Sequence, residues 1–318
     1  MNGKFSKSSI STHSNIQHKL AIIILTWNNL DDTAECIHSI NKLNYQNYNV
    51  ILVDNGSTDD SIAKLRSMFP NVFIIENKQN LGYAGGNNVG IQYALSQEAE
   101  HILVLNNDTI VAENLASELL KMNKQCQSLG ILGCANYYYN DKSRIQFSGG
   151  VIDWKRGNII DPTRHKIDRG QFHRIREVDT VVGSCLFIPA KVIREVGTFD
   201  PRYFLTFEES DLCCRVRKAG YKVYTCMRAK IWHKVSVSGK SQNQGHNILK
   251  YYSVRNRFLF LTKNSPKSYL LISYPYHIGR TIFQILRELI QGNSSRAKWL
   301  LIALIQGIFG RYGRGSFV

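Results

Sequence analysis

The 318-residue sequence lacks the cysteine patterns of disulfide-stapled and zinc-binding proteins. Its seven cysteines form an odd set, and none of them stands in a C-x-x-C pair or at zinc-ligand spacing. We therefore expect reduced, mostly buried thiols and a cytosolic compartment.

The sequence also lacks a hydrophobic run long enough to cross a membrane. Near its end, the two longest stretches without a formal charge are residues 268–279 and 299–310. Both are shorter than the roughly 18–20 residues that a membrane-spanning helix needs. Residues 1–18 are rich in Ser, Asn, His and Lys and lack the apolar segment of a secretory signal, which predicts a polar flexible leader.

Acidic residues are scarce in the last quarter of the chain. Residues 241–318 contain eleven lysines or arginines and one acid, Glu288, so most of the formal net charge of +16 lies there. A basic region can contact nucleic acid, anionic lipid or a phosphorylated substrate. No helix-turn-helix, zinc or RNA-binding signature accompanies it, so nucleic acid is not an expected partner.

The same region, residues 241–318, is predicted to be helical and amphipathic. Apolar residues such as Leu286, Ile290 and Trp299 are interleaved with basic ones such as Arg287 and Arg296. This pattern suits helices that lie in a membrane interface. It equally suits a helical hairpin that packs on the core and exposes a basic face to water, and the sequence leaves both interpretations open.

In the first half of the chain, short apolar runs alternate with helical patterns. Residues 20–26, 48–53, 72–75 and 101–105 are typical of strands buried in a parallel sheet. Helical spacing and caps indicate helices at about residues 30–43, 59–68, 85–95 and 114–122. The pattern predicts an α/β fold with a mainly parallel sheet, in which ligands gather at the carboxyl ends of the strands.

After about residue 133 the pattern changes. Two longer, partly alternating strands are predicted at residues 145–152 and 178–188, followed by a helix at about 210–220. Two brief strands are predicted at residues 221–225 and 230–233, before a helical tail that begins near residue 246.

Two polar motifs follow the early strands. Asp54 opens the segment Asp-Asn-Gly-Ser-Thr-Asp, and its carboxylate can accept hydrogen bonds from a nucleobase or ribose. Asn80 and Gly82 belong to a glycine-rich segment ahead of a helix, where the backbone can approach a diphosphate closely. This segment is not G-x-G-x-x-G, which argues against a nicotinamide-dependent dehydrogenase. Taken singly, either motif is also an ordinary turn or helix cap.

Two acidic motifs follow further along. The triplet Asn-Asn-Asp that ends at Asp108 comes directly after an apolar strand, a position suited to a divalent ion that bridges two phosphates, or to an Asx turn. Glu208, Glu209 and Asp211 enter a helix together. Their mutual repulsion can raise the pKa of one carboxyl group and make it a base, while Asp211 is explained as well by the helix dipole.

These four motifs, in this order, resemble the bacterial family-two glycosyltransferases with the GT-A fold, most of all their rhamnosyltransferase-like branch of cell-surface polysaccharide assembly. The resemblance runs from about Leu20 to Lys240. It implies a GT-A domain at residues 19–240, with a nucleotide-binding half at about 19–135 and an acceptor half at about 136–240.

The resemblance implies roles for individual residues. The matching donor nucleotide-binding positions are Thr26, Asn28, Asp54, Asn80, Gly82 and Asn107. Asp108 matches the last acid of the family's D-x-D triplet, which ligates a metal, and His233 matches a histidine that completes this site in some relatives. Glu209 stands where the family commonly has a catalytic Asp, and Glu208 and Asp211 are secondary acidic candidates.

The implied activity is inverting, metal-dependent transfer of a hexosyl or rhamnosyl group from a UDP- or dTDP-sugar, with Mn²⁺ or Mg²⁺ as cofactor. The implied acceptor is a glycan or a prenyl-diphosphate-linked saccharide, at the cytoplasmic face of an anionic membrane. Arg255 and Arg257 in the basic tail could bind a diphosphate or could simply be solvated. Asn106 replaces an acid of the triplet, and with Glu209 it suggests the alternative of a non-catalytic sugar-nucleotide binder or scaffold.

Overall fold

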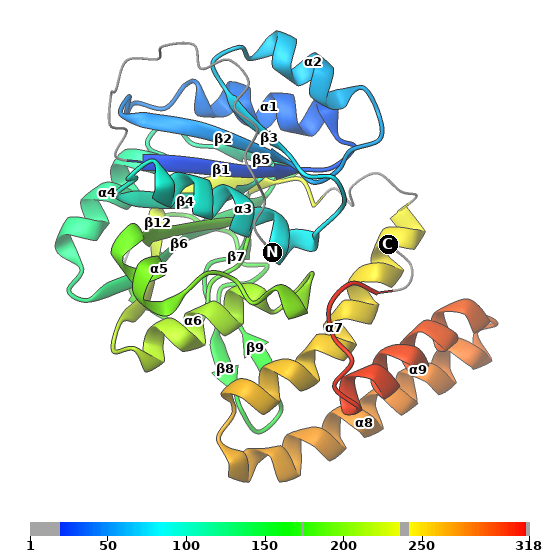
Figure 1. Cartoon of the computed structure of the whole chain (residues 1–318). Coiled ribbons are helices and arrows are strands. Elements are labelled where there is room, and N and C mark those ends of the chain that lie inside the picture. The colour runs from blue at the N-terminus through cyan, green and yellow to red at the C-terminus, as the bar shows by residue number, and fades with distance from the viewer. Residues whose placement is uncertain (1–19, 173–174, 236–241, 316–318) are drawn as a thin grey trace.

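The computed structural model of the protein describes residues 20–172, 175–235 and 242–315 (Figure 1). The predicted leader therefore lies outside the described residues. Within them, a ten-stranded mixed sheet is flanked by helices, with a group of three helices at the end of the chain. The α/β fold is confirmed.

The first half forms the parallel part of the sheet, as predicted. β1 (Leu20–Thr26) lies between β2 (Tyr48–Asp54) and β4 (His101–Asn106), and β3 (Phe73–Glu76) flanks β2. Because helices cover both faces, these strands are apolar at nearly every position. The strand order changes direction between β1 and β4, which creates a topological switch point at their carboxyl ends.

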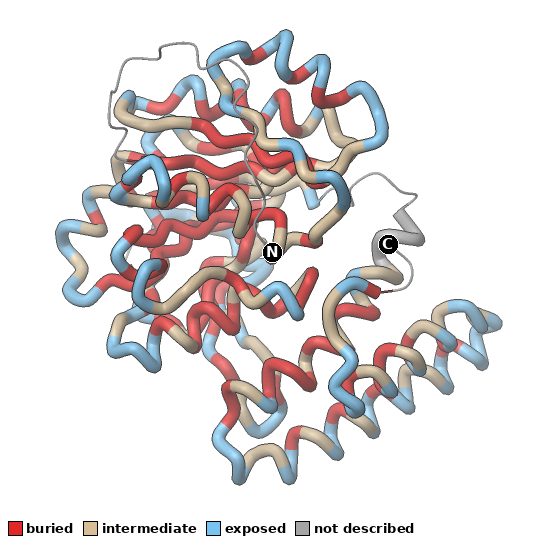
Figure 2. Tube along the Cα trace, viewed as in Figure 1, coloured by how far each residue is buried: buried red, intermediate tan, exposed pale blue. Residues whose placement is uncertain are grey.

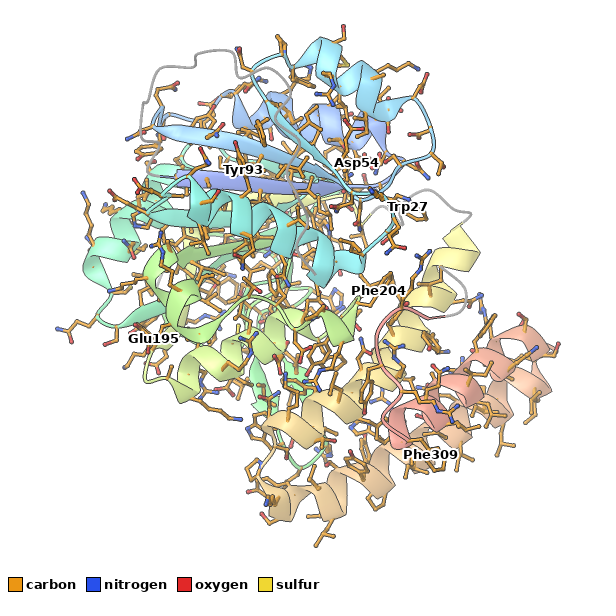
Figure 3. All side chains as sticks on the ribbon, viewed as in Figure 1. Trp27, Asp54, Tyr93, Glu195, Phe204 and Phe309 are labelled. Carbon is orange, nitrogen blue, oxygen red and sulfur yellow. The ribbon has the colours of Figure 1, made fainter. Side chains whose placement is uncertain are left out.

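Alternate side chains of these strands pack on two different helical layers. Leu20, Ile22 and Ile24 face α1 (Leu30–Ile40), α2 (Ser61–Met68) and α4 (Leu115–Gln125). Ala21 and Ile23 face α3 (Gly82–Ser96), α5 (Ala190–Val196) and α6 (Glu208–Lys218). The two cores thus hold the polar ends of the strands at one edge, where Figure 3 shows Asp54 and Trp27.

The second half continues the same sheet. β11 (Cys185–Pro189) runs antiparallel between β4 and β6 (Leu129–Tyr138), and β12 (Lys222–His233) lies parallel to β6. β10 (Arg176–Glu177) and β5 (Thr109–Val111) pair with β12, and β7 (Asp141–Phe147) pairs with β6. A hairpin of β8 (Val151–Asp153) and β9 (Asn158–Ile160) stands apart.

Four predicted strands of this half are wrong in extent. The strand predicted at residues 145–152 is broken between β7 and β8, because Gly149 has a φ of +104° that interrupts extended backbone. Of residues 178–188, only those from Cys185 onward form a strand, since the segment before it bends away and Thr180 bonds to Ser210. The two brief strands predicted before the tail are one strand, β12, with a register shift between Cys226 and Lys230.

The tail consists of α7 (Gln242–Asn264), α8 (Lys267–Ile290) and α9 (Ser294–Ile308). Buried α7 residues, including Tyr252 and Phe260, pack on the loop before α6, and α9 packs on α7 in turn. The outward faces of α8 and α9 are exposed (Figure 2). No helix among the described residues is long and apolar enough to cross a bilayer.

All seven cysteines are free thiols, and six of them are buried, as expected.

Candidate functional site

The loops after β1 and β2 are tied together by the predicted nucleotide-binding residues. The Asn28 backbone N–H donates to Ser57 Oγ at 2.9 Å, and the Thr58 N–H donates to Asn28 Oδ1 at 2.8 Å. Asp54 Oδ1 accepts from the Ser57 N–H at 2.9 Å. Asn28 has a φ of +49°, a left-handed conformation that Asn tolerates well. The two loops therefore form one preorganised edge beside the switch point.

Asn80 and Gly82 hold the start of α3 in place. Asn80 Oδ1 accepts from the Gly82 N–H at 2.8 Å and from Asn55 Nδ2 at 3.0 Å. A Cβ atom on Gly82 would lie 2.4 Å from the Phe204 carbonyl oxygen, so only glycine fits there. Asn55, which also accepts from the Leu81 N–H at 3.0 Å, is a positioning residue that the sequence analysis missed, although it follows Asp54 directly.

Thr26 and Asn107 lie on the other side of this edge and bond to α1. Asn107 Nδ2 donates to Thr33 Oγ1 at 2.9 Å, and the Thr26 and Thr33 hydroxyl oxygens lie 2.8 Å apart. Both side chains are buried. Their structural contacts anchor β1 and β4 to α1, and their proposed contacts with a nucleotide stay predictions.

Asp108 and His233 meet because β5 pairs with the end of β12. His233 lies opposite Thr109 in this pairing, which brings its Nε2 to 3.1 Å from Asp108 Oδ1. His233 Nδ1 lies 2.8 Å from Gln146 Oε1, an acceptor, so Nδ1 carries a proton and donates it. In the neutral imidazole this leaves Nε2 as an acceptor, which lies 3.4 Å from the donor Asn106 Nδ2 and beside the Asp108 carboxylate.

This arrangement fits a divalent cation. A metal ion about 2.1 Å from each of two ligands at a right angle holds them about 3 Å apart, close to the observed separation. Asn106 Oδ1 is buried beside them and has no hydrogen-bond partner in the described chain. No group of three or more His, Cys, Asp or Glu side chains suited to a metal occurs among the described residues. Asp108 and His233 would therefore supply two ligands, with substrate phosphates and water supplying the rest.

Glu208 and Glu209 form an acid pair at the start of α6. Each has one buried carboxyl oxygen without a hydrogen-bond partner. Burial, and then the charge of Glu209, raises the pKa of Glu208 well above its ordinary value. Burial raises the pKa of Glu209 to about 7, although backbone N–H groups and Glu208 oppose this rise. Glu208 thus keeps a proton while Glu209 is ready to take one near neutral pH, which is the property of a general base.

The loop before this pair is strained. Phe204, Thr206 and Phe207 have φ values of +60°, +70° and +73°, a conformation that side chains with a Cβ rarely adopt. Asn256 of α7, fully buried, donates from Nδ2 to the carbonyl oxygens of Tyr203 (2.6 Å), Leu205 (2.8 Å) and Thr206 (3.1 Å). One amide group from the tail therefore holds the loop that aims Glu208 and Glu209.

Tyr83 connects the two parts of the site. Burial, followed by the charges of Glu208 and Glu209 and a smaller effect of Asp108, raises the pKa of its phenol well above the ordinary value. Its hydroxyl donates to the Gly183 carbonyl at 2.5 Å. The charges of the acid pair and of Asp108 therefore act on the same phenol. Tyr83 lies inside the glycine-rich motif, but the sequence analysis did not single it out.

Asp211 does not belong to this site. Its carboxylate is fully buried, 2.9 Å from Arg215 Nε and 2.7 Å from Lys263 Nζ, and it accepts from Asn264 Nδ2 at 2.9 Å. These partners use its oxygens to join α6 to α7, so its candidacy as a base is not supported. Arg255 is likewise neither solvated nor open to a diphosphate: it is 1% exposed, donates to the Gly313 carbonyl at 2.7 Å and lies over the Tyr252 ring.

Comparison with known proteins identifies the family of this chain. The family model described as "Glycosyl transferase family 2" matches residues 21–197, which is more than half of the chain. A low-salt glycan biosynthesis hexosyltransferase, Agl10 of Haloferax volcanii, is 24% identical over 93% of this chain and 92% of its own. The dTDP-rhamnosyl transferase RfbF of Shigella flexneri is 25% identical over 87% of this chain and 92% of its own.

A third relative has a lipid-linked sugar in its name. The N-acetylglucosaminyl-diphospho-decaprenol L-rhamnosyltransferase of Mycobacterium tuberculosis is 25% identical over 70% of this chain and 78% of its own. Among solved structures, the mannosyltransferase PcManGT of Pyrobaculum calidifontis, in complex with GDP-Man and Mn²⁺, has a TM-score of 0.59 at 14% identity, over 92% of this chain and 88% of its own. That likeness shows the shared GT-A fold.

Proposed function

The chain belongs to glycosyl transferase family 2, and we propose that it moves a hexosyl or rhamnosyl group from a UDP- or dTDP-sugar to a hydroxyl group of a glycan or lipid-linked acceptor, with inversion, in the assembly of a cell-surface polysaccharide. The observation that carries this proposal is the buried pair Glu208–Glu209, in which each carboxyl group has one oxygen without a hydrogen-bond partner among the described residues, together with the contact of Asp108 and His233 at 3.1 Å. The charges of the acid pair and of Asp108 both act on the Tyr83 phenol, which supports a base and a candidate metal site in one functional region.

The proposed reaction is one in-line displacement. Glu209 takes the proton of the acceptor hydroxyl group as its oxygen forms a bond to the anomeric carbon of the donor. The bond from that carbon to the diphosphate breaks, and its electron pair leaves with the nucleoside diphosphate. Because entry and departure occur on opposite faces, the configuration inverts. Glu208, which keeps its proton, stabilises the ionised form of Glu209 before the transfer.

Asp108 and His233 would hold a divalent cation, Mn²⁺ or Mg²⁺, together with the donor diphosphate. When bound, the cation supplies positive charge that offsets the charge of the leaving diphosphate. Gln146 keeps His233 in the tautomer that presents Nε2. Asn28, Asp54, Asn80 and Gly82 build the edge on which the nucleoside would lie.

We also propose that the protein works at the cytoplasmic face of an anionic membrane. The outward faces of α8 and α9, and Phe309 directly after α9, expose large apolar side chains. On the two helices these are Leu271, Ile272, Ile282, Phe283, Leu286, Leu289, Ile290, Leu301, Ile305 and Ile308. Arg287 and Lys298 lie on the same two helices. Apolar side chains that enter the interface, with basic ones at its surface, favour binding to anionic lipid at about 1 kcal/mol per basic residue.

The test is a screen of UDP- and dTDP-sugars for nucleotide release by the purified protein with Mn²⁺ or Mg²⁺. Mass analysis of products on a prenyl-diphosphate-linked acceptor then identifies the transfer, and NMR of the new linkage reports its configuration. We expect Glu209→Gln to abolish turnover and keep donor binding. Donor binding without transfer or hydrolysis by the unaltered protein would instead establish the non-catalytic alternative, and unchanged turnover in Glu209→Gln would exclude Glu209 as the base.

A further inference from the structure

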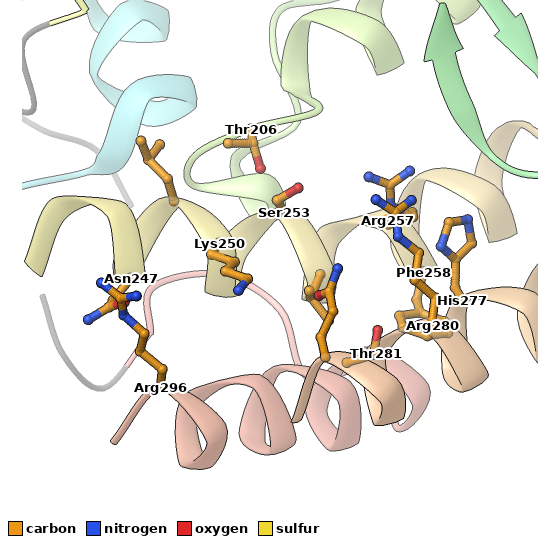
Figure 4. A pocket seen from close by; sticks show the side chains of 13 residues that line it. Thr206, Asn247, Lys250, Ser253, Arg257, Phe258, His277, Arg280, Thr281 and Arg296 are labelled. Carbon is orange, nitrogen blue, oxygen red and sulfur yellow. The ribbon is translucent and has the colours of Figure 1, made fainter. Parts of the chain in front are cut away.

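A basic cavity lies between the tail and the loop that precedes the acid pair. Its volume is about 780 Å³, within the range of small-ligand sites. Figure 4 shows lining side chains from α7, α8 and α9, together with Thr206 from the loop before α6. Four basic side chains line it and no acidic one does: Lys250, Arg257, Arg280 and Arg296. An excess of positive charge around a cavity of this size favours an anionic ligand.

Two of these arginines have no carboxylate partner among the described residues. Arg257 Nη1 donates to the Gly157 carbonyl at 2.6 Å and to Asn158 Oδ1 at 3.1 Å, and its guanidinium lies over the Phe207 ring. Arg280 Nη1 reaches the same Asn158 oxygen at 3.4 Å. Burial and the charge of Arg280 lower the pKa of Arg257 to about 10. Two cations that converge on one neutral oxygen repel each other, and an anion between them would relieve that repulsion.

An unsatisfied hydroxyl group belongs to Thr206, a residue that lines the same cavity. Thr206 Oγ1 is buried and has no hydrogen-bond partner in the described chain. A buried hydroxyl group without a partner costs free energy, so it marks a position where a ligand oxygen would bind. Thr206 belongs to the strained loop that leads into Glu208 and Glu209. Only two residues of the chain separate Thr206, at the cavity, from the proposed base Glu209.

One face of α8 lines this cavity, and the opposite face is exposed to solvent. His277, Arg280, Thr281 and Gln284 line the cavity and follow one face of the helix. The exposed apolar residues Ile282, Phe283, Leu286 and Ile290 follow the other face. A ligand with an anionic group at one end and a hydrocarbon chain at the other matches both faces of a single helix.

We propose that this cavity binds the diphosphate of a prenyl-diphosphate-linked acceptor, with Arg257, Arg280 and Thr206 as ligands of its phosphate oxygens. This assignment rests on the proposed function, since it names the acceptor of the same site. The diphosphate in the cavity places the acceptor sugar toward the acid pair, and the prenyl chain leaves toward the apolar face of α8. The donor nucleotide and phospholipid headgroups also carry phosphate groups. They are therefore the competing ligands that the experiment must distinguish.

The experiment measures binding of farnesyl diphosphate, a soluble probe, to the full chain by calorimetry in the absence of a sugar donor. We expect binding by the unaltered protein, no detectable binding of farnesol, and a loss of about tenfold or more in Arg280→Gln and Thr206→Val. Arg280 is exposed, so its variant should fold normally. Arg287→Gln is the matched control, because this arginine lies on the same helix outside the cavity and its removal should leave binding unchanged.

Each other outcome overturns the assignment. Displacement of farnesyl diphosphate by UDP or dTDP in competition would identify the cavity as part of the donor site. Arg280→Gln and Arg287→Gln could lose farnesyl diphosphate binding equally and lose binding to phosphatidylglycerol vesicles to the same extent. That result would identify a general lipid contact. Because the probe binds without turnover, absence of sugar transfer would refute the proposed function and leave this binding result intact.

Discussion

Asn256 offers the most direct test of how the tail controls the acid pair. Its side-chain amide has two N–H groups and serves three carbonyl oxygens of the strained loop, while Arg255 Nε donates to its Oδ1 at 3.0 Å. Asn256→Ala removes about two full hydrogen bonds from a buried site, at about 1 kcal/mol each. The unpaired carbonyls then favour rearrangement of the loop.

Rearrangement of this loop recovers part of the free energy that Asn256→Ala loses with its hydrogen bonds. Each left-handed residue stores on the order of 1 kcal/mol or more, so return of Thr206 or Phe207 to an ordinary conformation offsets some of the lost bonding. We therefore expect a net loss of only about 1–2 kcal/mol in the free energy of unfolding. We expect kcat to fall by about 10²-fold, because a displacement of roughly 1 Å in a catalytic group has that effect.

Urea unfolding and steady-state kinetics with saturating donor and acceptor measure the two effects separately. Asn264→Ala is the matched control: this amide lies on the same helix and donates to Asp211 and to the Phe260 carbonyl, at 2.9 and 3.2 Å. It should lose similar stability and keep most of its kcat. A pH–rate profile should also shift in Asn256→Ala, since Glu209 would leave its buried position. If Asn256→Ala loses stability but retains kcat within twofold, the proposed control of Glu209 is refuted.

Three further predictions concern the base, the cation and the tail. The folded protein holds a proton on Glu209 that the unfolded chain releases above about pH 4.5, so the free energy of unfolding falls as pH rises from there to about 7. Glu208, whose pKa is also raised, adds to this slope. Glu209→Gln should therefore reduce the slope and raise the free energy of unfolding by up to about 3 kcal/mol at pH 8 in urea titrations, and an unchanged slope would contradict the raised pKa of Glu209. Gln146→Ala should weaken Mn²⁺ binding about 10-fold or more in calorimetry with donor present, whereas equal affinity would show that Gln146 does not orient His233. Phe283→Ser with Ile290→Ser should lower binding to phosphatidylglycerol vesicles by tenfold or more. Met68→Ser, which changes an exposed apolar residue distant in the chain, should not lower it, and equal binding by all variants would exclude the α8 face from the membrane contact.

Much of the first half could be predicted from the sequence because its signals are local. An apolar run with turn residues behind it specifies a buried strand and its polar end with little help from distant residues. This is why Asp54 and Asp108 were placed at strand ends that do meet at one edge. The strand bounds of the second half were predicted less well. Gly149 and the register shift between Cys226 and Lys230 interrupt strands in ways that apolar periodicity does not reveal.

The sequence by itself determined the fold class, the family and the identities of the acidic residues, since each is written in contiguous segments. Only the tertiary structure decided which other residues lie next to these acidic residues. The pairing of β5 with β12 brings His233 to Asp108 across more than a hundred residues, and Gln146 arrives from a third segment. The same packing buries Arg255 and leaves Arg257 and Arg280 facing a cavity, although all three are basic residues of one helical tail. Side-chain burial and partners depend on contacts between distant segments, and a charge pattern along the chain carries no information about which face will be covered.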